Sequence, residues 1–278
     1  MVPRRAAAGR WEWRCVGYEA TRDGVTAFFE DGGTAHGTVL VAADGIGSAI
    51  RRQRPPHARV ADSGARLIYG RVPLTPRLRG ELPAAMFSVF TTITGPGQRF
   101  PGIVPGATGR GHGPAHPWFG PGTEADSLAV MFGRRRESLG LTDHDLLAAS
   151  GGRLREVVLD QIAGWHPLLR RVVSGWDAST LYPSTVRSSV PVSPWASSNV
   201  TLLGDAVHAM SPAAGAGANM ALGDAAALST ALAEAAAGSP IVEVVGAYER
   251  DMLTEGFDAV KRSSANGVRT LGENPLPW

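Results

Sequence analysis

Residues 202–228, LLGDAVHAMSPAAGAGANMALGDAAAL, place an apolar strand directly before an aspartate, a proline and a turn of very small residues. A strand ending at Gly204 would deliver the Asp205 carboxylate to the carboxyl edge of a sheet, where open α/β folds bind ligands. Pro212 stiffens the turn. The Ala-rich residues that follow predict a helix starting near Asn219.

The small residues of this turn predict a surface that a flat ligand can approach closely. Gly215 and Gly217, with Ala216 and Ala218 beside them, leave the backbone amides accessible. The helix that follows would point the positive end of its dipole at the same place, which suits an electron-rich ring that becomes an anion on reduction. A planar redox cofactor satisfies these features, but a tightly packed strand-to-helix turn explains them equally well.

A second stretch, VLVAADGIGSAIRR at residues 39–52, repeats the arrangement. Its apolar strand ends at Asp44-Gly45, Gly45 and Gly47 allow a sharp bend, and residues 48–53 predict the start of a helix. Ile50 stands where a dinucleotide fingerprint has its third glycine, so the GxGxxG pattern is incomplete. Two strands that each end in aspartate before a small-residue turn favour a ligand site.

The two stretches together resemble a known family. Asp44-Gly45-x-x-Ser48-x-x-Arg51 resembles the DG motif of flavoprotein monooxygenases of the para-hydroxybenzoate hydroxylase type. Residues 204–228 resemble their GD motif, with matches at Gly204, Asp205, Ala206, His208, Pro212, Gly215, Gly217, Asn219 and Asp224. The resemblance covers about residues 13–262. It implies a mixed α/β fold: a Rossmann-like FAD/NAD(P)-binding domain with an inserted antiparallel β-sheet substrate domain and C-terminal helices.

The resemblance also implies residue roles. Asp205, after Gly204, would bind the ribitol or ribose side of FAD, and Pro212, the candidate catalytic position, would lie near the flavin edge where oxygen reacts. The backbone of Gly215, Ala216, Gly217, Ala218 and Asn219 would hold the pyrimidine part of the ring. Asp44, with Gly45, Ser48 and Arg51, would help bind FAD and the nicotinamide cofactor at the pyrophosphate region. His208 is at least as well explained as a structural residue, and no metal site is expected.

The implied activity is hydroxylation of an aromatic or flat apolar small molecule, with FAD as cofactor, NADH or NADPH as reductant, and O2. The protein would position and desolvate the reactants while the cofactor carries the chemistry. A flavin-dependent reductase, dehydrogenase or halogenase is the nearest rival. The halogenase is disfavoured because WEWRC at residues 11–15 lacks the Ile-Pro ending of a W-x-W-x-I-P motif.

One departure from the family pattern concerns the start of the chain. That family opens with a strand, GxGxxG and a helix, and no such unit precedes Asp44. The FAD-binding domain is therefore expected to be incomplete at its N-terminus, with the strands before Asp44 and Asp205 lacking neighbours. The alternatives are a truncated chain, an inactive remnant, or half of a split flavoenzyme that a complementing N-terminal chain completes; a homodimer is a further option.

Three segments are expected: residues 1–65 and 191–278 of the FAD-binding domain, and a substrate domain at 66–190.

A meander is predicted at 13–21, 25–30 and 38–44, with its last strand deep in a sheet. Antiparallel strands follow at 65–74, 86–93 and 127–133. Residues 101–122 predict a surface loop or a lid. The spacing at 141–176 predicts helices with an N-cap at Thr142 and a break at Gly151-Gly152, before extended chain at 179–192 and helices at 219–238 and 242–270. The apolar and aromatic residues at 67–72 and 87–93 fit either the hydrophobic core or the lining of a substrate pocket.

Composition excludes several other classes. The chain is 44% hydrophobic and carries a formal charge of +2, which favours a packed globular protein and no nucleic-acid surface. Its single cysteine, Cys15, and the absence of a long apolar run predict a cytoplasmic protein without a membrane span or internal disulfide. His112 and His116 lie in a Gly/Pro-rich stretch and are not expected to bind metal.

Overall fold

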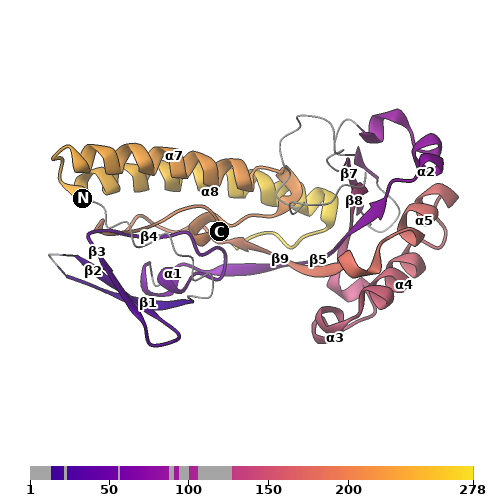
Figure 1. Ribbon diagram of the computed structural model, residues 1–278, viewed down its shortest axis with the longest axis horizontal. Helices are drawn as coiled ribbons and strands as arrows, with labels where there is room; N and C mark the ends of the chain where they lie inside the picture. The colour runs from indigo at the N-terminus through magenta and orange to yellow at the C-terminus, as the bar shows by residue number, and fades with distance from the viewer. Residues whose placement is uncertain are drawn as a thin grey trace. The chain divides into compact units, whose positions relative to one another are not determined.

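The computed structural model describes residues 14–21, 24–55, 57–87, 91–93, 100–105 and 127–277. The chain divides into two compact units, coloured by residue number in Figure 1. Unit 1 consists of Met1–Ala61, Arg187–Ser264 and Leu276–Trp278, and unit 2 of Asp62–Val186 and Ala265–Pro275. His112, His116 and most of the predicted loop at 101–122 lie outside the described residues.

Unit 1 begins with the predicted meander, but with a different third strand. β1 (Cys15–Ala20), β2 (Val25–Phe29) and β3 (Thr34–Gly37) pair in that order, all antiparallel. The Asp31 side chain accepts the Gly33 amide at 2.8 Å and closes a tight turn that returns the chain beside β2 at Thr34. The strand predicted at 38–44 is confirmed by β4 (Leu40–Ala42), but its place as the third strand of the meander is wrong, because residues 34–37 complete the meander and the chain then bends into another sheet.

That other sheet joins the two strands that precede the motifs. β4 (Leu40–Ala42) and β10 (Val200–Leu202) run parallel, with Val200 opposite Leu40 and Leu202 opposite Ala42. The expectation that these strands lack neighbours is wrong, since each is the other's neighbour. β10 is fully buried, whereas β4 is only partly buried and is not deep in a larger sheet of described strands.

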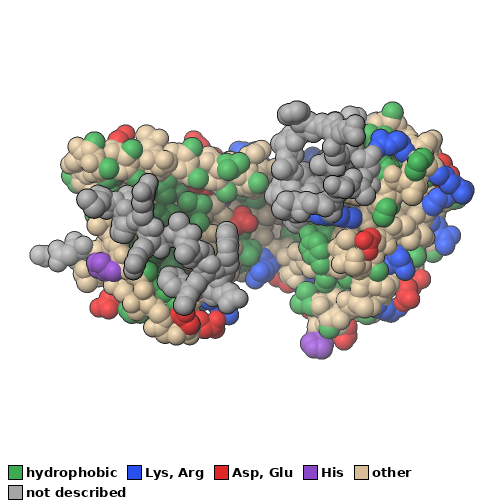
Figure 2. Space-filling model, viewed as in Figure 1, with side chains coloured by type: hydrophobic (Ala, Val, Ile, Leu, Met, Phe, Trp, Pro, Cys, Tyr) green, Lys and Arg blue, Asp and Glu red, His purple; other side chains and the backbone are tan. Residues whose placement is uncertain are grey.

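The helices of unit 1 follow from these strands. They are α1 (Ala49–Gln53), α6 (Asp205–His208), a 3₁₀ turn η4 (Pro212–Ala214), α7 (Gly217–Ala236) and α8 (Ile241–Leu271), whose last residues belong to unit 2. α7 begins two residues before the predicted Asn219 and ends before Gly238, whose φ is +114°. Its outer face is almost uncharged, with Leu222 69% exposed, and Figure 2 shows few charges on the viewed side of this helix.

Unit 2 is built on a five-stranded sheet whose first four strands, in the order given next, pair antiparallel. Its order is β6 (Thr91–Thr92), β7 (Phe100–Pro105), β8 (Ser127–Arg135), β5 (Val60–Pro73) and β9 (Tyr182–Ser189). The strands predicted at 65–74 and 127–133 are confirmed. The strand predicted at 86–93 is wrong at its start, where Ala84–Phe87 forms a 3₁₀ turn, η1. β7 also contradicts a loop at 101–105, because a ladder to β8 supplies the backbone bonds of this Pro- and Gly-containing segment.

Helices of unit 2 cover one face of this sheet. They are α2 (Pro76–Glu81), α3 (Asp143–Ala148), α4 (Gly151–Gln161) and α5 (Pro167–Ser174), with the 3₁₀ turns η2 (Arg136–Ser138) and η3 (Ala178–Thr180). The Thr142 side chain caps α3, as predicted, by accepting the Asp145 amide. The predicted break between two helices occurs, but at Ala149-Ser150 rather than at Gly151-Gly152, because Ser150 caps α4 and Gly151 is its first residue. A Cβ on Gly151 would lie 1.8 Å from the Ala178 carbonyl oxygen, which explains the glycine.

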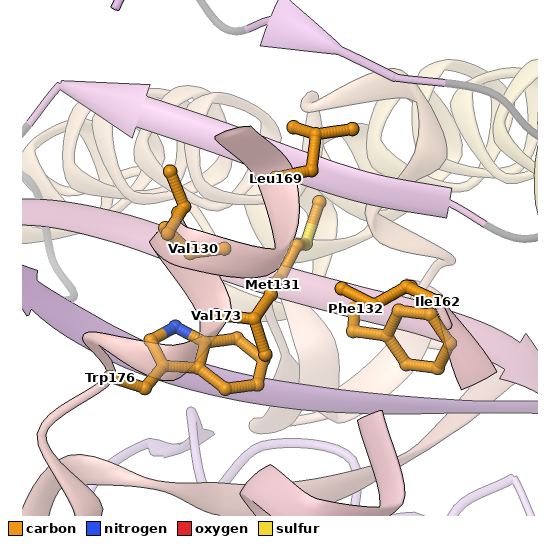
Figure 3. Close-up of a pocket in the computed structure, with 8 residues that line it drawn as sticks. Val130, Met131, Phe132, Ile162, Leu169, Val173 and Trp176 are labelled. Carbon is orange, nitrogen blue, oxygen red and sulfur yellow. The ribbon is translucent and has the colours of Figure 1, made fainter. Parts of the chain in front are cut away.

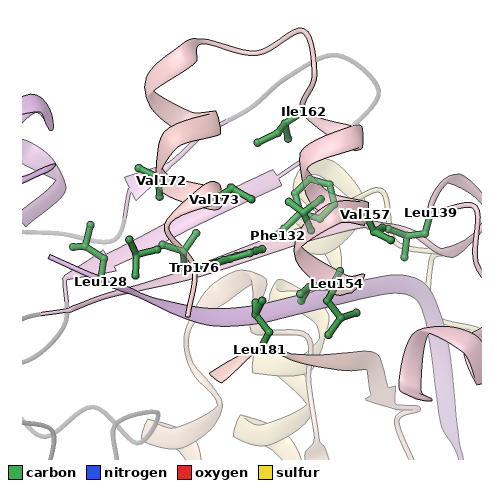
Figure 4. Packing of buried hydrophobic residues seen from close by; sticks show 14 of the residues in the cluster. Leu128, Phe132, Leu139, Leu154, Val157, Ile162, Val172, Val173, Trp176 and Leu181 are labelled. Carbon is green, nitrogen blue, oxygen red and sulfur yellow. The ribbon is translucent and has the colours of Figure 1, made fainter. Parts of the chain in front are cut away.

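The core of unit 2 lies between α4, α5 and the sheet. Figure 4 shows Leu128 and Phe132 of β8 packed with Leu154, Val173 and Trp176. Ile68 and Val72 of β5 belong to the same cluster, so these two positions of segment 67–72 are core. Tyr69 and Arg71 alternate with them and lie on the opposite face.

Candidate functional site

The two motifs meet at one edge of the parallel pair in unit 1. β4 and β10 are in register at Ala42 and Leu202, and the Leu203 amide donates to the Ala42 carbonyl at 3.0 Å. Asp44 and Asp205 follow these strand ends at the same carboxyl edge, and both are exposed. The edge thus carries two carboxylates from segments far apart in the sequence.

The DG segment forms a tight turn that leads into α1. Gly45 adopts φ +73° and accepts the Ser48 amide through its carbonyl at 2.9 Å. The Asp44 carboxylate accepts the Ala49 amide at 3.0 Å, while Ser48, with no exposed surface, accepts the Arg51 amide. A Cβ added at Gly45 or Gly47 would meet nothing within 4 Å, so open space lies over this turn.

Arg51 ties the two motifs together. Its guanidinium, 7% exposed, donates to the carbonyl of Ala206 at 2.8 Å and to the carbonyl of Ile46. Burial lowers the pKa of this guanidinium, and the nearby Asp44 carboxylate acts in the opposite direction. Because the side chain is buried and bonded to backbone on both sides, it fixes the DG turn against the residue that follows Asp205.

A buried carboxylate fixes the turn of the GD motif. Gly204 has φ +58° and ψ −138°, a conformation that favours glycine. Its amide donates to Asp224 Oδ2 at 2.7 Å, and His208 Nε2 lies 2.6 Å from the same oxygen. An ionised carboxylate only accepts, so His208 Nε2 carries the proton. The structure supports a structural role for His208, which is 1% exposed.

α8 makes room for this histidine. A Cβ on Gly256 would lie 2.4 Å from His208 Cδ2, so the imidazole occupies the space that a side chain there would need. The other ring nitrogen, Nδ1, is buried and has no hydrogen-bond partner among the described residues. These contacts hold the turn between β10 and α6 in place. Asp205 projects from the first turn of α6, and no described residue donates a hydrogen bond to its carboxylate.

Hydrogen bonds, one of them from α8, hold the turn that carries Pro212. The Ser211 side chain caps η4, and Ser263 of α8 donates its hydroxyl to the Ser211 carbonyl at 2.5 Å. Gly215 adopts φ +62° and its amide donates to the Pro212 carbonyl at 2.9 Å. Pro212 itself is exposed, and a Cβ on Gly215 would meet nothing within 4 Å.

The start of α7 leaves donors available. Ala216 precedes the helix without a capping side chain, and the first bond to it comes from the Met220 amide at 3.0 Å. The amides of Gly217, Ala218 and Asn219 therefore have no partner in the described part of the chain. They lie at the positive end of a 20-residue helix and can bind acceptor atoms that carry negative charge.

These features fit FAD. The exposed Asp44 and Asp205 carboxylates suit hydroxyl donors of a sugar or ribitol chain, and the free amides at Gly217–Asn219 suit the oxygen and nitrogen acceptors of a flavin ring. The open space over Gly45, Gly47 and Gly215 admits a flat group. Ser48 and Arg51 lie beneath this surface, where they support the turns.

The sequence pointed to Arg51 as a cofactor-binding residue and to Asp224 as a match to the GD motif, but it did not reveal their supporting contacts, nor Ser263 at all. These roles depend on contacts between distant segments. Asp224 carried one signal, an acidic residue within an otherwise apolar stretch of α7. No group of three metal-binding side chains occurs among the described residues, and none of the helices described there has the length and apolar character needed to cross a bilayer.

Comparison with known proteins agrees with this geometry. The family described as FAD binding domain matches residues 179–263. A structure from Photorhabdus luminescens, described as an FAD-containing monooxygenase, is 31% identical, with a TM-score of 0.78, and the match covers 93% of this chain and 68% of that one. The dual O-methyltransferase/FAD-dependent monooxygenase elcB of Phaeosphaeria nodorum is 31% identical over 288 residues, 90% of this chain.

A third relative is the 6-methylsalicylate 1-monooxygenase atA of Aspergillus terreus, 28% identical over 73% of this chain. The chain spans 31% of the length of elcB and 41% of that of atA. The site geometry, the family match and the Photorhabdus structure lead to one conclusion. The chain belongs to the FAD-dependent monooxygenases of the para-hydroxybenzoate hydroxylase type.

Proposed function

We propose that this protein hydroxylates a flat aromatic small molecule with FAD, NADPH or NADH, and O2. In the overall reaction, substrate, NAD(P)H, a proton and O2 give hydroxylated substrate, NAD(P)+ and water. Two observations together carry the proposal: Arg51 joins the DG and GD turns, and the amides at the start of α7 are free among the described residues. An aromatic substrate is supported by the relative named for 6-methylsalicylate.

The proposal assigns a binding role to each exposed residue of the site. FAD, when bound, supplies the redox chemistry that passes electrons from the reductant to oxygen. Asp205 accepts hydrogen bonds from the ribitol or ribose hydroxyls, and Asp44 with Gly45 serves the pyrophosphate region and the nicotinamide cofactor. The amides of Gly217–Asn219, with the Gly215-Ala216 turn before them, hold the pyrimidine end of the ring and stabilise negative charge there.

Pro212 and the buried residues have different tasks. Pro212, exposed on a turn that Ser263 holds, shapes the place where oxygen reacts and carries no proton itself. Ser48, Arg51 and Gly204 keep the two turns in position without reaching the ligand. Their burial supports this division, since Ser48 has no exposed surface and Arg51 is 7% exposed.

A second candidate is a chain that binds FAD only together with another polypeptide or a second copy. The described parallel sheet of unit 1 has just two strands, β4 and β10, and parallel sheets normally have more strands and covered faces. The almost uncharged outer face of α7, with Leu222 69% exposed, offers a further contact surface. Sedimentation of the purified chain with and without FAD separates this candidate from the first.

The proposed reaction is tested with isotopic oxygen. The purified chain is incubated with FAD, NADPH or NADH, and 6-methylsalicylate or a related aromatic compound under 18O2. Incorporation of one labelled oxygen atom into the product, with one NAD(P)H consumed, is the expected result. Two results would show that the proposed hydroxylation is wrong. One is oxidation of NAD(P)H to NAD(P)+ with reduction of O2 to hydrogen peroxide alone, whichever compound is added; the other is a product whose new oxygen comes from water.

A further inference from the structure

A buried carboxylate on α8 lies against the strand that leads into the GD motif. Glu249 is 3% exposed, and no ion pair joins it to a Lys or Arg side chain in the described part of the chain. Its partners are neutral: the Trp195 indole and the Thr201 hydroxyl both donate to Oε1 at 3.0 Å, and the Ser197 hydroxyl donates to Oε2 at 2.8 Å. Thr201 is the central residue of β10, and the other two donors lie just before this strand. One side chain of α8 therefore fixes the segment at three points.

The surface of α8 allows this close approach. Gly246 lies three residues before Glu249, on the same face of the helix. A Cβ on Gly246 would lie 2.8 Å from Ser197 Oγ, so the hydroxyl occupies the space that a side chain there would need. Glycine lowers the stability of a helix interior relative to alanine. The contact with residues 195–201 explains its presence within α8.

The outer edge of β10 is bonded by side chains, and no described strand pairs with it. The Asn199 carbonyl and the Leu203 amide bond to β4, so the Leu202 carbonyl, by alternation, faces the opposite edge. There Tyr248 of α8 donates its hydroxyl to the Leu202 carbonyl at 3.0 Å. The Gly204 amide, on the same edge, bonds to the buried carboxylate of α7. Side chains of α7 and α8 thus take the place of a neighbouring strand.

Tyr248 keeps its proton for this bond. Burial raises the pKa of its phenol, and the nearby Asp224 and Glu249 carboxylates act in the same direction. A neutral phenol can donate to a carbonyl oxygen, whereas a phenolate cannot. The Leu202 carbonyl therefore has a donor near neutral pH.

β10 depends on these contacts because it is short. It has three residues, and its described partner strand, β4, also has three. Two strands that pair only with each other form a sheet of marginal stability. Asp205 follows the end of β10 at Leu202 by three residues, so a shift of the strand would move the carboxylate that is assigned to FAD.

The enclosed cavity of unit 2 does not offer a binding site of its own. It measures about 10 Å³ and lies among apolar and aromatic side chains that include Phe132, Ile162, Leu169 and Trp176 (Figure 3). That volume holds about one water molecule at most. It gives no reason to place a cofactor away from the carboxyl edge of β4 and β10.

We propose that Glu249 and Tyr248 are positioning residues of the candidate FAD site, which set the place of β10 and, through it, that of Asp205. The inference rests on the proposed role of Asp205 in FAD binding. Glu249 acts as a hydrogen-bond acceptor, and its charge is not required. A glutamine at this position can accept from two of the three donors and donate its NH₂ group to the Ser197 hydroxyl oxygen. Neither positioning residue contacts a ligand.

The test compares Glu249→Gln and Glu249→Leu by hydrogen exchange and by FAD titration. Amide exchange of residues 199–207, followed by mass spectrometry without FAD, reports how firmly β10 is held. Glu249→Leu leaves three donors without an acceptor and should speed this exchange and weaken FAD binding, each by at least about tenfold. Glu249→Gln should stay within about twofold of the wild-type protein in both measurements.

Four further variants complete the comparison. Thr201→Val and Tyr248→Phe each remove one bond and keep the side-chain shape, so each should change both quantities about threefold in the same direction. These two variants decide the test if Glu249→Leu does not fold. Glu255→Leu, at an exposed position of α8, should change neither quantity. Leu154→Ala, in the core of unit 2, should lower the melting temperature without changing either quantity.

Three results would overturn the inference. They are wild-type exchange and FAD affinity in a folded Glu249→Leu variant, an equal loss in Glu249→Gln and Glu249→Leu, or an equal loss of FAD affinity in Leu154→Ala. The exchange measurement needs no FAD and therefore separates the two proposals. If exchange responds as expected but the wild-type protein binds no FAD, the proposed function fails and the hold on β10 stands. If the wild-type protein binds FAD and exchange does not respond, only the positioning role fails.

Discussion

His208 on α6 and Asp224 on α7 are joined through a single carboxylate oxygen, with Nε2 and Oδ2 2.6 Å apart. The same oxygen accepts the Gly204 amide at 2.7 Å. One buried side chain thus connects the end of β10, the helix that presents Asp205 and the helix whose free amides line the site. The orientation of the exposed residues depends on this contact, although none of its members faces a ligand.

Removal of this carboxylate is expected to be costly. Asp224→Ala leaves the Gly204 amide and His208 Nε2 buried without an acceptor, and each unpaired group costs about 1–3 kcal/mol. We expect the free energy of unfolding to fall by about 3 kcal/mol in urea titrations. Glu234→Ala, an exposed change in the same helix, should change it by less than about 0.5 kcal/mol. Equal effects of the two substitutions would contradict the assigned role.

Adjacent arginines on α1 allow a matched test of the link between the motifs. Arg51→Lys keeps the charge but cannot reach the carbonyls of Ile46 and Ala206 together. We expect a loss of about 2 kcal/mol in stability and weaker FAD binding. Arg52→Lys is the control, because Arg52 is exposed and, among the residues that the structure describes, its side chain donates only to the Gly47 carbonyl. Indistinguishable melting temperatures and FAD affinities for both variants would refute the link.

Ser263 and Ser264 offer a similar pair on α8. Both are buried, but among the described residues only the Ser263 hydroxyl, and not that of Ser264, makes a hydrogen bond, to the Ser211 carbonyl that precedes Pro212. Ser263→Ala should cost about 1 kcal/mol and weaken FAD binding, since the Pro212 turn loses its support. Ser264→Ala should leave FAD binding unchanged. Flavin fluorescence titrations measure the FAD affinity of both variants. Equal affinities would show that Ser263 does not support the FAD site.

Unit 2 should lose stability in acid through Arg66. This buried guanidinium donates to Asp62 and Asp143, which lowers the pKa of both carboxyls in the folded protein. The unfolded chain, with an ordinary aspartate pKa of about 3.9, therefore binds protons first. The stabilisation is complete above about pH 5 and is lost as the pH falls through the lower folded pKa values.

Urea titrations between pH 6 and pH 3 measure this effect. We expect the free energy of unfolding to fall with decreasing pH in that range, and to fall less steeply in Asp143→Asn, because one of the two linked carboxyls is gone. A variant with the same pH slope as the wild-type protein would show that the Arg66 contacts do not carry the dependence.

Local signals in the sequence predicted the turns and helix starts around the candidate site. Gly45, Gly204 and Gly215 occur where the backbone has positive φ, and the caps Ser48 and Thr142 begin the helices that their side chains favour. Such features depend on neighbours within a few residues, so spacing alone reveals them.

Features that depend on distant contacts could not be predicted in this way. The requirement for glycine at position 151 comes from the close Ala178 carbonyl, and the assignment of Leu40–Ala42 to a parallel sheet comes from its pairing with β10. The sharing of Asp224 between Gly204 and His208 likewise appears only when α7 packs under the turn. In each case tertiary contacts override what the local pattern indicates.

The most direct test of the account is an FAD titration of the purified chain, followed by flavin fluorescence and visible absorption, with Asp205→Ala and Asp251→Ala in parallel. Asp251 is an exposed residue of α8 and serves as the control. We predict saturable binding by the wild-type protein and by Asp251→Ala, and affinity at least about tenfold weaker for Asp205→Ala, since a charge-assisted hydrogen bond is lost. Absence of saturable binding in a chain that circular dichroism shows to be folded, or equal affinity in all three proteins, would contradict the account.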